Sequence, residues 1–274
     1  MKRYIQSFAT DIGTVRKTNQ DSLLIQKAET PVGEVVLAAV CDGMGGYNQG
    51  ELASKICVLE LRRWFQTSLP ALMPLVQKGE EDEFEHAVFE QWEEVILSVN
   101  AQLVALGEGN NQLLGTTATV FLLAGNRYLA AHVGDSRGYL VQKSRLAQVT
   151  EDQSFVAWEV REGRMTAEEA MTDKRRSVLL ETVGVTENVH ILTYRGNCSN
   201  ETLLLCSDGF WHFVQENELC SLLSPGSVSD FFTLRNNLLY LVEEVKNRGE
   251  RDNITVVAVC PSTESGQDND EYGG

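Results

Sequence analysis

The chain has 274 residues, of which 43% are hydrophobic, enough to form a substantial core in one large domain or two small ones. Its 23 Lys and Arg against 39 Asp and Glu give a net charge of −16, which argues against nucleic acid as a general partner, because a phosphate backbone requires a basic face. Such an excess of acid is compatible with the binding of divalent cations.

The sequence shows no pattern typical of a transmembrane segment or a signal peptide. No run reaches about 18 uninterrupted apolar residues, and the first residues lack the apolar core of a signal peptide. We therefore expect a cytoplasmic protein with no membrane partner. The six cysteines are dispersed, without the CxxC pairs of zinc sites or the density of a disulfide scaffold, so they are interpreted as reduced core residues.

Residues 4–10, 22–27 and 34–40 form the first three strand-like segments. A turn containing Pro and Gly separates the second from the third, which predicts an antiparallel hairpin. This hairpin carries Asp21 and Asp42 at neighbouring ends. The loop before it is rich in hydrogen-bonding side chains, and such loops are often functional.

Two amphipathic helices are expected next, at residues 51–65 and 80–106, because apolar side chains recur there at helical spacing. They are predicted to lie as an antiparallel pair on a sheet. Between them, Pro70 and Pro74 are expected to bar a continuing helix. The first half of the second helix carries eight acidic residues and no Lys or Arg, which we interpret as a solvated face rather than a binding site.

Four short β-rich runs follow and predict a meander with Asp135 between its second and third strands, at residues 116–123, 127–133, 138–142 and 146–149. Residues 151–184 then break the β rhythm. They are polar and partly helical, and Thr166 begins a capping box. We interpret this segment as an inserted flap and call it the flap.

Residues 189–194 and 202–206 are expected to form the next strand pair, and Asp208 follows the second of them. Asp252 immediately precedes a continuous apolar strand at residues 254–259. In an antiparallel neighbour, an acid that precedes a strand lies at the same edge as one that follows a strand.

A third long helix is predicted for residues 228–247, ended by Gly249, with a buried face formed by Phe231, Phe232, Leu238, Val242 and Val245. Residues 262–274 are acidic and poor in apolar side chains, which predicts a disordered tail. No repeat or linker divides the rest, so residues 1–261 are expected to form one domain. The order of elements implies an α+β sandwich of two mostly antiparallel sheets with helices packed outside.

The acids at the strand ends suggest a metal site. One Asp-Gly is usually a plain turn, but five acids on one antiparallel scaffold resemble a cation cluster: Asp21, Asp42, Asp135, Asp208 and Asp252. Oxygen ligands without His or Cys favour Mg²⁺ or Mn²⁺ over zinc. Two bridged metals would relieve the repulsion between the carboxylates and generate a hydroxide at neutral pH, and hydrolysis of phosphate esters fits that chemistry best.

Arg16 lies in the loop just before Asp21. Taken alone it could be an ordinary surface arginine. Beside an acid cluster in an acidic protein, we favour a role in gripping two phosphate oxygens, which a lysine could not reproduce.

With these residues in place, the chain resembles the bacterial members of the metal-dependent PP2C-type (PPM) serine/threonine protein phosphatases. Seven stretches carry the resemblance in family order from about residue 3 to 260: Asp11-Ile-Gly-Thr-Val-Arg-Lys-Thr-Asn-Gln-Asp21, Asp42-Gly-Met-Gly-Gly-Tyr-Asn-Gln-Gly-Glu-Leu-Ala-Ser54, Gly115-Thr-Thr-Ala118, Val133-Gly-Asp-Ser-Arg137, Thr150-Glu-Asp-Gln-Ser154, Leu205-Cys-Ser-Asp-Gly209 and Asp252-Asn-Ile-Thr-Val256.

The resemblance implies a four-layer α-β-β-α fold, with pairs of antiparallel helices flanking the sandwich, and a role for each matching position. Asp42 would bridge two Mn²⁺ or Mg²⁺ ions, with the Gly43 carbonyl on one and Asp208 and Asp252 on the other. Asp21 would hold a metal-coordinated water, and Arg16 would bind the phosphoryl group. Asp135, together with Asp208, would help to bind a third, weaker ion.

The implied activity is hydrolysis of phosphoserine and phosphothreonine in proteins, opposing a bacterial Ser/Thr kinase. The flap would border the cleft and influence substrate choice. The chain is expected to act as a monomer.

Some positions depart from the family pattern. His212 stands where many relatives carry an acid that ligates the third metal, and Met44 replaces a histidine thought to be a general acid in eukaryotic relatives. Within the flap, Gln153 replaces a common histidine, and Leu180-Glu181-Thr182 departs from Leu-Thr-Arg.

Two other hypotheses about the function compete with a phosphatase. A regulatory or binding module that keeps the fold but turns over little would account for His212 and the altered flap. A nucleotide-binding glycine loop at residues 43–46 is rejected, because the run matches neither GxGxxG nor GxxxxGK[ST] and no alternating β-α pattern follows.

Overall fold

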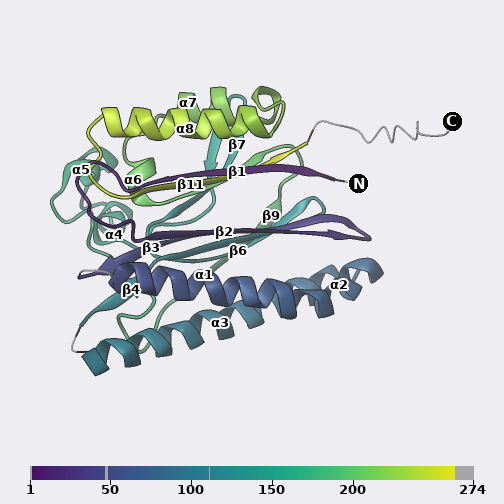
Figure 1. Ribbon diagram of the computed structural model, residues 1–274, viewed down its shortest axis with the longest axis horizontal. Helices are drawn as coiled ribbons and strands as arrows, with labels where there is room; N and C mark the ends of the chain where they lie inside the picture. Colours follow the sequence, from purple (N-terminus) through teal and green to yellow (C-terminus); the bar gives the residue numbers. More distant parts are fainter. Residues whose placement is uncertain (1, 47–48, 111, 263–274) are drawn as a thin grey trace.

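The computed structural model describes residues 2–46, 49–110 and 112–262. Two β-sheets are stacked face to face, and helices cover the outer face of each (Figure 1). The expected α+β sandwich with four α-β-β-α layers is confirmed. No helix in these residues is long and apolar enough to cross a membrane. The predicted disordered tail falls almost entirely outside the described residues.

The first sheet is antiparallel throughout and has two fully buried strands at its centre. Its strands, in spatial order, are β1 (Tyr4–Asp11), β11 (Ile254–Pro261), β10 (Thr202–Cys206), β7 (Arg137–Gln142) and β8 (Arg145–Gln148). The first and last strands of the described residues lie side by side here, because β1 pairs with β11 along its whole length.

The second sheet is also antiparallel, and its longest strand lies next to one edge. In spatial order its strands are β2 (Asp21–Thr30), β3 (Gly33–Gly45), β5 (Ala118–Ala124), β6 (Arg127–Val133) and β9 (Leu192–Asn197). The short β4 (Leu114–Thr116) pairs with the end of β3. The expected hairpin of β2 and β3 is confirmed.

Two expected strand pairings are wrong. The predicted meander divides between the sheets, with β5 and β6 in one and β7 and β8 in the other, so the chain crosses the sandwich at residues 134–136. The strands β9 and β10 do not pair. Every residue of β10 is buried, which requires neighbours on both edges, whereas β9 alternates between partly buried and exposed residues as an edge strand does.

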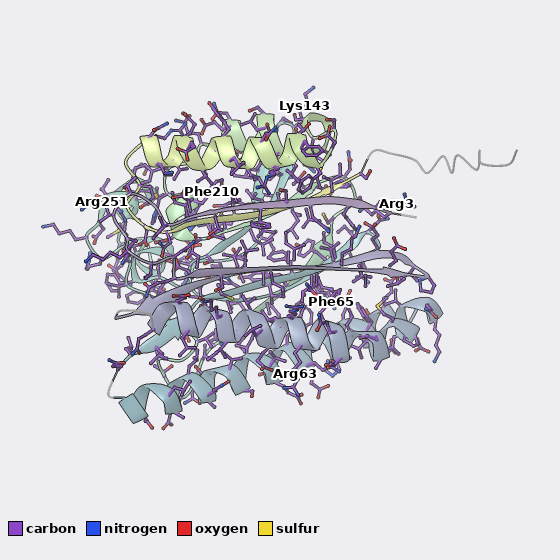
Figure 2. The ribbon with its side chains drawn as sticks, viewed as in Figure 1. Arg3, Arg63, Phe65, Lys143, Phe210 and Arg251 are labelled. Carbon is purple, nitrogen blue, oxygen red and sulfur yellow. The ribbon has the colours of Figure 1, made fainter. Side chains whose placement is uncertain are left out.

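Three helices cover the second sheet: α1 (Gln49–Thr67), α2 (Leu69–Lys78) and α3 (Glu81–Asn110) (Figure 1). Figure 2 shows Phe65 of α1 turned toward the sheet and Arg63 turned away from it. As expected, α1 ends before Pro70 and Pro74, but a separate helix, α2, contains both prolines, which the sequence did not predict. Pro70 lies in the first turn of α2, where its missing N–H costs nothing, and Pro74 removes only one bond from a short helix.

The acidic first half of α3 is not solvated throughout. Glu85 is 3% exposed, and its carboxylate pairs with Arg127 and Arg195 at 2.9 and 3.0 Å. The two arginines lie on β6 and β9. Glu85 therefore ties α3 to the edge of the sheet, and the interpretation of the run as a solvated face is wrong at this position.

The first sheet is covered by α7 (Glu216–Leu223) and α8 (Phe231–Asn247), with a 3₁₀ turn, η1 (Pro225–Ser227), between them (Figure 1). The prediction that Phe231 and Phe232 are buried is wrong, since they are 45% and 73% exposed. The buried stripe of α8 starts at Leu234. Phe232 lies roughly 200° around the helix from Leu234, on the opposite face.

The flap lies at one end of the sandwich and holds α4 (Phe155–Arg161) and α5 (Ala167–Thr172), close to α6 (Asp208–Trp211) (Figure 1). The predicted capping box is confirmed. Thr166 accepts a hydrogen bond from the Glu169 backbone N–H, and the Glu169 carboxylate accepts one from the Thr166 N–H.

Candidate metal centre

The acids predicted from the strand ends come together at the flap end of the sandwich. Asp21 and Asp42 are direct partners in the register of β2 and β3. Asp208 follows β10, Asp252 precedes β11, and Asp135 lies in the crossing from β6 to β7. Because antiparallel strands alternate in direction, an acid that precedes one strand and an acid that follows the next strand lie at the same end of the sheet.

Two glycines allow the backbones at this edge to approach closely. A Cβ on Gly43 would lie 2.0 Å from the Gly50 carbonyl oxygen, and one on Gly209 would lie 2.1 Å from the Asn253 carbonyl oxygen. Both contacts are with backbone, which cannot move aside cheaply. Glycine is therefore required beside Asp42, and also beside Asp208, where it brings the start of α6 against the segment that carries Asp252.

The loop that carries Arg16 is anchored by Asn253. The amide of Asn253 donates to the carbonyls of Ile12 and Thr18 at 2.9 and 3.0 Å, and its oxygen accepts from the Gln20 N–H at 2.9 Å. These bonds hold the loop beside Asp252. The guanidinium of Arg16 pairs there with the Asp252 carboxylate at 2.5 Å.

A cavity of about 170 Å³ lies at the centre of this arrangement, and we call it the catalytic cavity. Six of the seven predicted site residues line it: Arg16, Asp42, Gly43, Asp135, Asp208 and Asp252. The seventh, Asp21, does not line the cavity, and its carboxylate accepts a hydrogen bond of 2.8 Å from Ser207, next to Asp208. Met44 lines the cavity and offers no titratable proton.

The carboxyl groups crowd one another. Burial raises the pKa of Asp21 to about 7 and that of Asp208 to about 6, with neighbouring carboxylates adding to both shifts. Burial and the nearby acids also hold the pKa values of Asp42 and Asp135 well above their usual range. Such a set gains from any cation that removes the repulsion.

The oxygen chemistry of the set fits a hard divalent cation. The Oδ1 atoms of Asp21 and Asp208 are buried and have no hydrogen-bond partner among the described residues. Buried, unpaired carboxylate oxygens are costly unless an ion satisfies them. Within residues 2–46, 49–110 and 112–262, however, no three acidic, His or Cys side chains form a ready-made metal-binding group. Arg16 occupies Asp252, so cation binding would require that pair to open.

His212 lies beside the set, in a neutral state. Its Nδ1 is 3.9 Å from both Asp208 Oδ2 and Glu250 Oε2, and burial lowers its pKa to about 4. Glu250 was not predicted as a site residue. Its Oε1 accepts from the backbone N–H groups of Arg251 and Asp252, so it fixes the turn that presents Asp252. Its position two residues before Asp252 is the only signal in the sequence.

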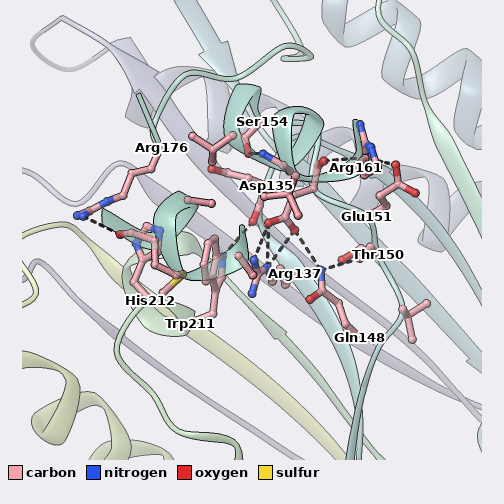
Figure 3. A pocket seen from close by; sticks show the side chains of 18 of the residues that line it. Asp135, Arg137, Gln148, Thr150, Glu151, Ser154, Arg161, Arg176, Trp211 and His212 are labelled. Carbon is pink, nitrogen blue, oxygen red and sulfur yellow. Dashed lines mark hydrogen bonds and ion pairs between the residues drawn. The ribbon is translucent and has the colours of Figure 1, made fainter. Parts of the chain in front are cut away.

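A second unpredicted group supports Asp135. The indole of Trp211 donates to the Asp135 carbonyl at 3.0 Å, and the guanidinium of Arg137 stacks 3.3 Å from the centre of the Trp211 ring. Asp152 grips Arg137 with both carboxylate oxygens, at 2.9 and 2.7 Å. Figure 3 shows Arg137 between Trp211 and the start of the flap. The flap and Asp135 are therefore linked through stacked side chains.

Gln153 joins the flap to the same crossing. Its side-chain oxygen accepts from the Gly134 N–H at 2.8 Å, and its amide donates to the His190 carbonyl at 2.9 Å. The departure from histidine at this position therefore provides an acceptor and a donor that together hold the base of the flap against the residue next to Asp135.

Comparison with known proteins identifies relatives over nearly the whole chain. The family described as Protein phosphatase 2C matches residues 14–239. A "Serine/threonine phosphatase stp" from Listeria monocytogenes is 34% identical over 259 residues, 92% of this chain and 94% of the relative.

Solved structures agree with this match. The serine/threonine phosphatase Stp1 from Staphylococcus aureus has a TM-score of 0.78 and 27% identity, covering 93% of this chain and 94% of that one. The catalytic domain of the serine threonine protein phosphatase PstP, in complex with two manganese ions, has a TM-score of 0.73 and 27% identity, covering 96% and 100%.

Proposed function

The chain belongs to the protein phosphatase 2C family and is a metal-dependent serine/threonine protein phosphatase, and from this premise we propose which of its residues perform the hydrolysis. Its substrates are phosphoproteins. The observation that carries the proposal is the catalytic cavity, in which one arginine and four carboxylates face the same space.

We propose that two divalent ions would be held here, with Asp42 as a ligand to both, the Gly43 carbonyl as a ligand to one, and Asp208 and Asp252 as ligands to the other. The unpaired buried oxygens and the mutual repulsion of the carboxyls support this assignment. Bound divalent ions supply Lewis acidity, which makes water a nucleophile near neutral pH and offsets the charge of the phosphoryl group.

The side chains of the protein bind and orient the substrate. Arg16 would leave Asp252 and grip two phosphoryl oxygens, because a guanidinium matches that geometry with two parallel hydrogen bonds. Asp21, held by Ser207, would accept a hydrogen bond from the attacking water and so orient it. Because bound divalent ions would make water a nucleophile, we propose direct attack by water without a covalent phosphoenzyme. Since Met44 offers no proton, water would also protonate the leaving oxygen.

The choice of metal belongs to this proposal. Oxygen-only ligands suit both Mg²⁺ and Mn²⁺, and we propose two core ions, with Mn²⁺ favoured by the manganese-bound structural relative. A third, weaker ion would bind near Asp135 and Asp208. Neutral His212, in place of an acid, would reduce the negative charge there and weaken it.

We also propose that the enzyme opposes a Ser/Thr protein kinase, because a protein phosphatase needs a source of its substrate. Action as a monomer and a cytoplasmic location remain predictions from the sequence. The alternative of a module with little turnover is not favoured, since relatives that match nine-tenths of the chain are named as phosphatases.

The proposal is tested with enzyme dialysed against a chelator. Hydrolysis of p-nitrophenyl phosphate and of a phosphothreonine peptide is measured with no metal, with Mg²⁺ and with Mn²⁺, for the wild type and for Asp208→Asn. We expect metal-dependent turnover that the substitution abolishes. Asp82→Asn, on the exposed face of α3, is the matched control and keeps wild-type activity. Turnover without metal, or turnover that survives Asp208→Asn, would overturn the assignment.

A further inference from the structure

A second cavity lies beside the catalytic cavity, under the flap, and we call it the flap cavity. Its volume is about 570 Å³, within the range of roughly 300–1,000 Å³ that is typical of sites for small molecules and peptide side chains. Figure 3 shows it bounded by Trp211 and His212 on one side and by Arg161 and Glu151 of the flap on another.

The walls of the flap cavity are mostly apolar. They are formed by one face of α4, one face of α5 and the indole of α6, through Val156, Ala157, Val160, Ala170, Met171 and Trp211. Met171 is 42% exposed although it is a large apolar side chain, and three further apolar side chains of the flap are also exposed: Trp158, Val178 and Leu180. Of these four residues, Met171 lines the cavity, and a large apolar side chain left exposed in an apolar wall is typical of a binding site.

The charged groups that line the cavity largely neutralise one another. Arg137 is held by Asp152, and Arg161 is paired with Glu151. The exceptions are Asp135, at the side shared with the catalytic cavity, and Arg176, which donates to the Met171 carbonyl at 3.4 Å; neither has an ion pair among the described residues. The interior of the cavity therefore suits an apolar group, and its remaining positive charge is on the segment that leads to the catalytic cavity.

The flap cavity and the catalytic cavity are neighbours. Asp135 lines both of them. Arg176 lines the flap cavity, and the next residue, Ser177, lines the catalytic cavity together with Leu179. An extended peptide advances about 3.3 Å per residue. A chain with its phosphorylated residue in the catalytic cavity would therefore reach the flap cavity within a few residues.

We propose that the flap cavity binds an apolar side chain of the phosphoprotein, a few residues from the phosphorylated serine or threonine, and so selects substrates by their local sequence. This inference rests on the proposed function of the catalytic cavity. It assigns to α4 and α5 the role of a specificity pocket, and it predicts that leucine or phenylalanine near the phosphorylated residue favours hydrolysis over serine or aspartate at the same position.

The test uses the metal-loaded full chain and a set of phosphothreonine peptides in a Gly/Ser background. One leucine is moved through about four positions on either side of the phosphothreonine. We expect one position at which leucine raises kcat/KM by about 10-fold over serine, as is usual for occupation of an apolar pocket. Equal kcat/KM for all the peptides would overturn the proposal.

Two substitutions then fill the cavity from different helices, Ala170→Phe and Ala157→Phe. Each should reduce the preference for leucine, measured as the ratio of kcat/KM for the leucine and serine peptides, to near unity. Ala71→Phe, on an exposed position of α2, adds the same bulk elsewhere and should keep the preference. A full leucine preference in both filled variants would overturn the proposal. Loss of metal-dependent p-nitrophenyl phosphate hydrolysis in the wild type would instead overturn the proposed function.

Discussion

Arg16 Nη2 lies 2.5 Å from Asp252 Oδ2, so the candidate phosphate-binding residue is paired with a candidate metal ligand. The two side chains are 49% and 34% exposed, which makes the pair easy to open. Each group would exchange one partner for another during function: Asp252 would turn to a cation and Arg16 to a phosphoryl group. On the proposed roles, the pair would therefore couple occupation of the metal site to readiness for substrate.

Arg16→Gln tests this exchange. It removes the charged grip on the phosphoryl group, and we expect kcat/KM for p-nitrophenyl phosphate to fall roughly 10–100-fold, in keeping with the loss of hydrogen bonds to a charged group. It also removes a cation from Asp252, so Mn²⁺ should bind more tightly in calorimetric titration. Arg251→Gln is the control, because Arg251 points away from the molecule in Figure 2. Weaker Mn²⁺ binding in Arg16→Gln would contradict the idea that Arg16 competes with the ion.

Asp42→Asn separates catalysis from stability. Loss of a bridging ligand should lower activity by more than about 100-fold, since even a group that supports a ligand is worth 10–100-fold. The same change removes one of the mutually repelling carboxyls, so the metal-free variant should melt at the same temperature as the wild type or above it.

Thermal melts with and without Mn²⁺ check the stability of Asp42→Asn. In the wild type, an ion at about 100 times its Kd should add roughly 2.7 kcal/mol of stability, and the variant should lose most of this gain. Asp82→Asn, the surface control, should behave as the wild type. A large drop in the melting temperature of metal-free Asp42→Asn would show that Asp42 is needed mainly for folding.

His132 should make the fold sensitive to mild acid. It is fully buried and lies between Thr119 Oγ1 at 2.9 Å and the Gly134 carbonyl at 3.0 Å, and burial lowers its pKa to about 4. The unfolded chain takes up this proton near pH 6.5, whereas the folded chain stays neutral. The contribution to stability is therefore complete above pH 6.5 and is lost as the pH falls toward 4, by roughly 3 kcal/mol in all.

Urea unfolding between pH 7 and pH 5 measures this loss. The buried carboxyls with raised pKa values act in the opposite direction, so the informative quantity is the difference between the wild type and His132→Gln. That difference should shrink as the pH falls. His86→Gln, at an exposed position, is the surface control. A constant difference for His132→Gln would mean that its imidazole does not titrate between folded and unfolded states.

The strand ends of the candidate site were predictable because their signal is local. An acid next to an apolar run marks a strand end, and repetition of that pattern identified Asp42, Asp208 and Asp252 before any spatial information. The pairing of strands was less accessible. The run containing β10 is apolar in the same way whether its neighbour is β9 or β11, and only the packing of two sheets decides between them.

Supporting side chains were missed for a related reason. Glu250 and Trp211 act through hydrogen bonds to backbone groups in the next turn or far away in the sequence. Gln153, noted in the sequence only as a departure from the family pattern, acts in the same way. Neither spacing nor composition marks such contacts. The exposure of Phe232 is a different error, since it follows from the helical phase of Leu234, which the sequence already contained.

Glu85 tests whether a run of acidic residues in the sequence is enough to predict a solvated helix face, because Glu85 belongs to such a run but is buried. Glu85→Gln leaves Arg127 and Arg195 without their shared partner. Breaking a buried ion pair costs about 3–5 kcal/mol, but these arginines are 38% and 64% exposed, so solvent screening should reduce the loss to about 1–2 kcal/mol. Glu83→Gln, in the same turn but exposed, should change the free energy of unfolding by less than about 0.5 kcal/mol. Urea denaturation of both variants compares their free energies of unfolding directly.

Because Glu85 lies far from the catalytic cavity, Glu85→Gln should leave kcat unchanged. Equal losses of stability in Glu85→Gln and Glu83→Gln would contradict a structural role for Glu85 and would support the solvated face that the sequence predicted.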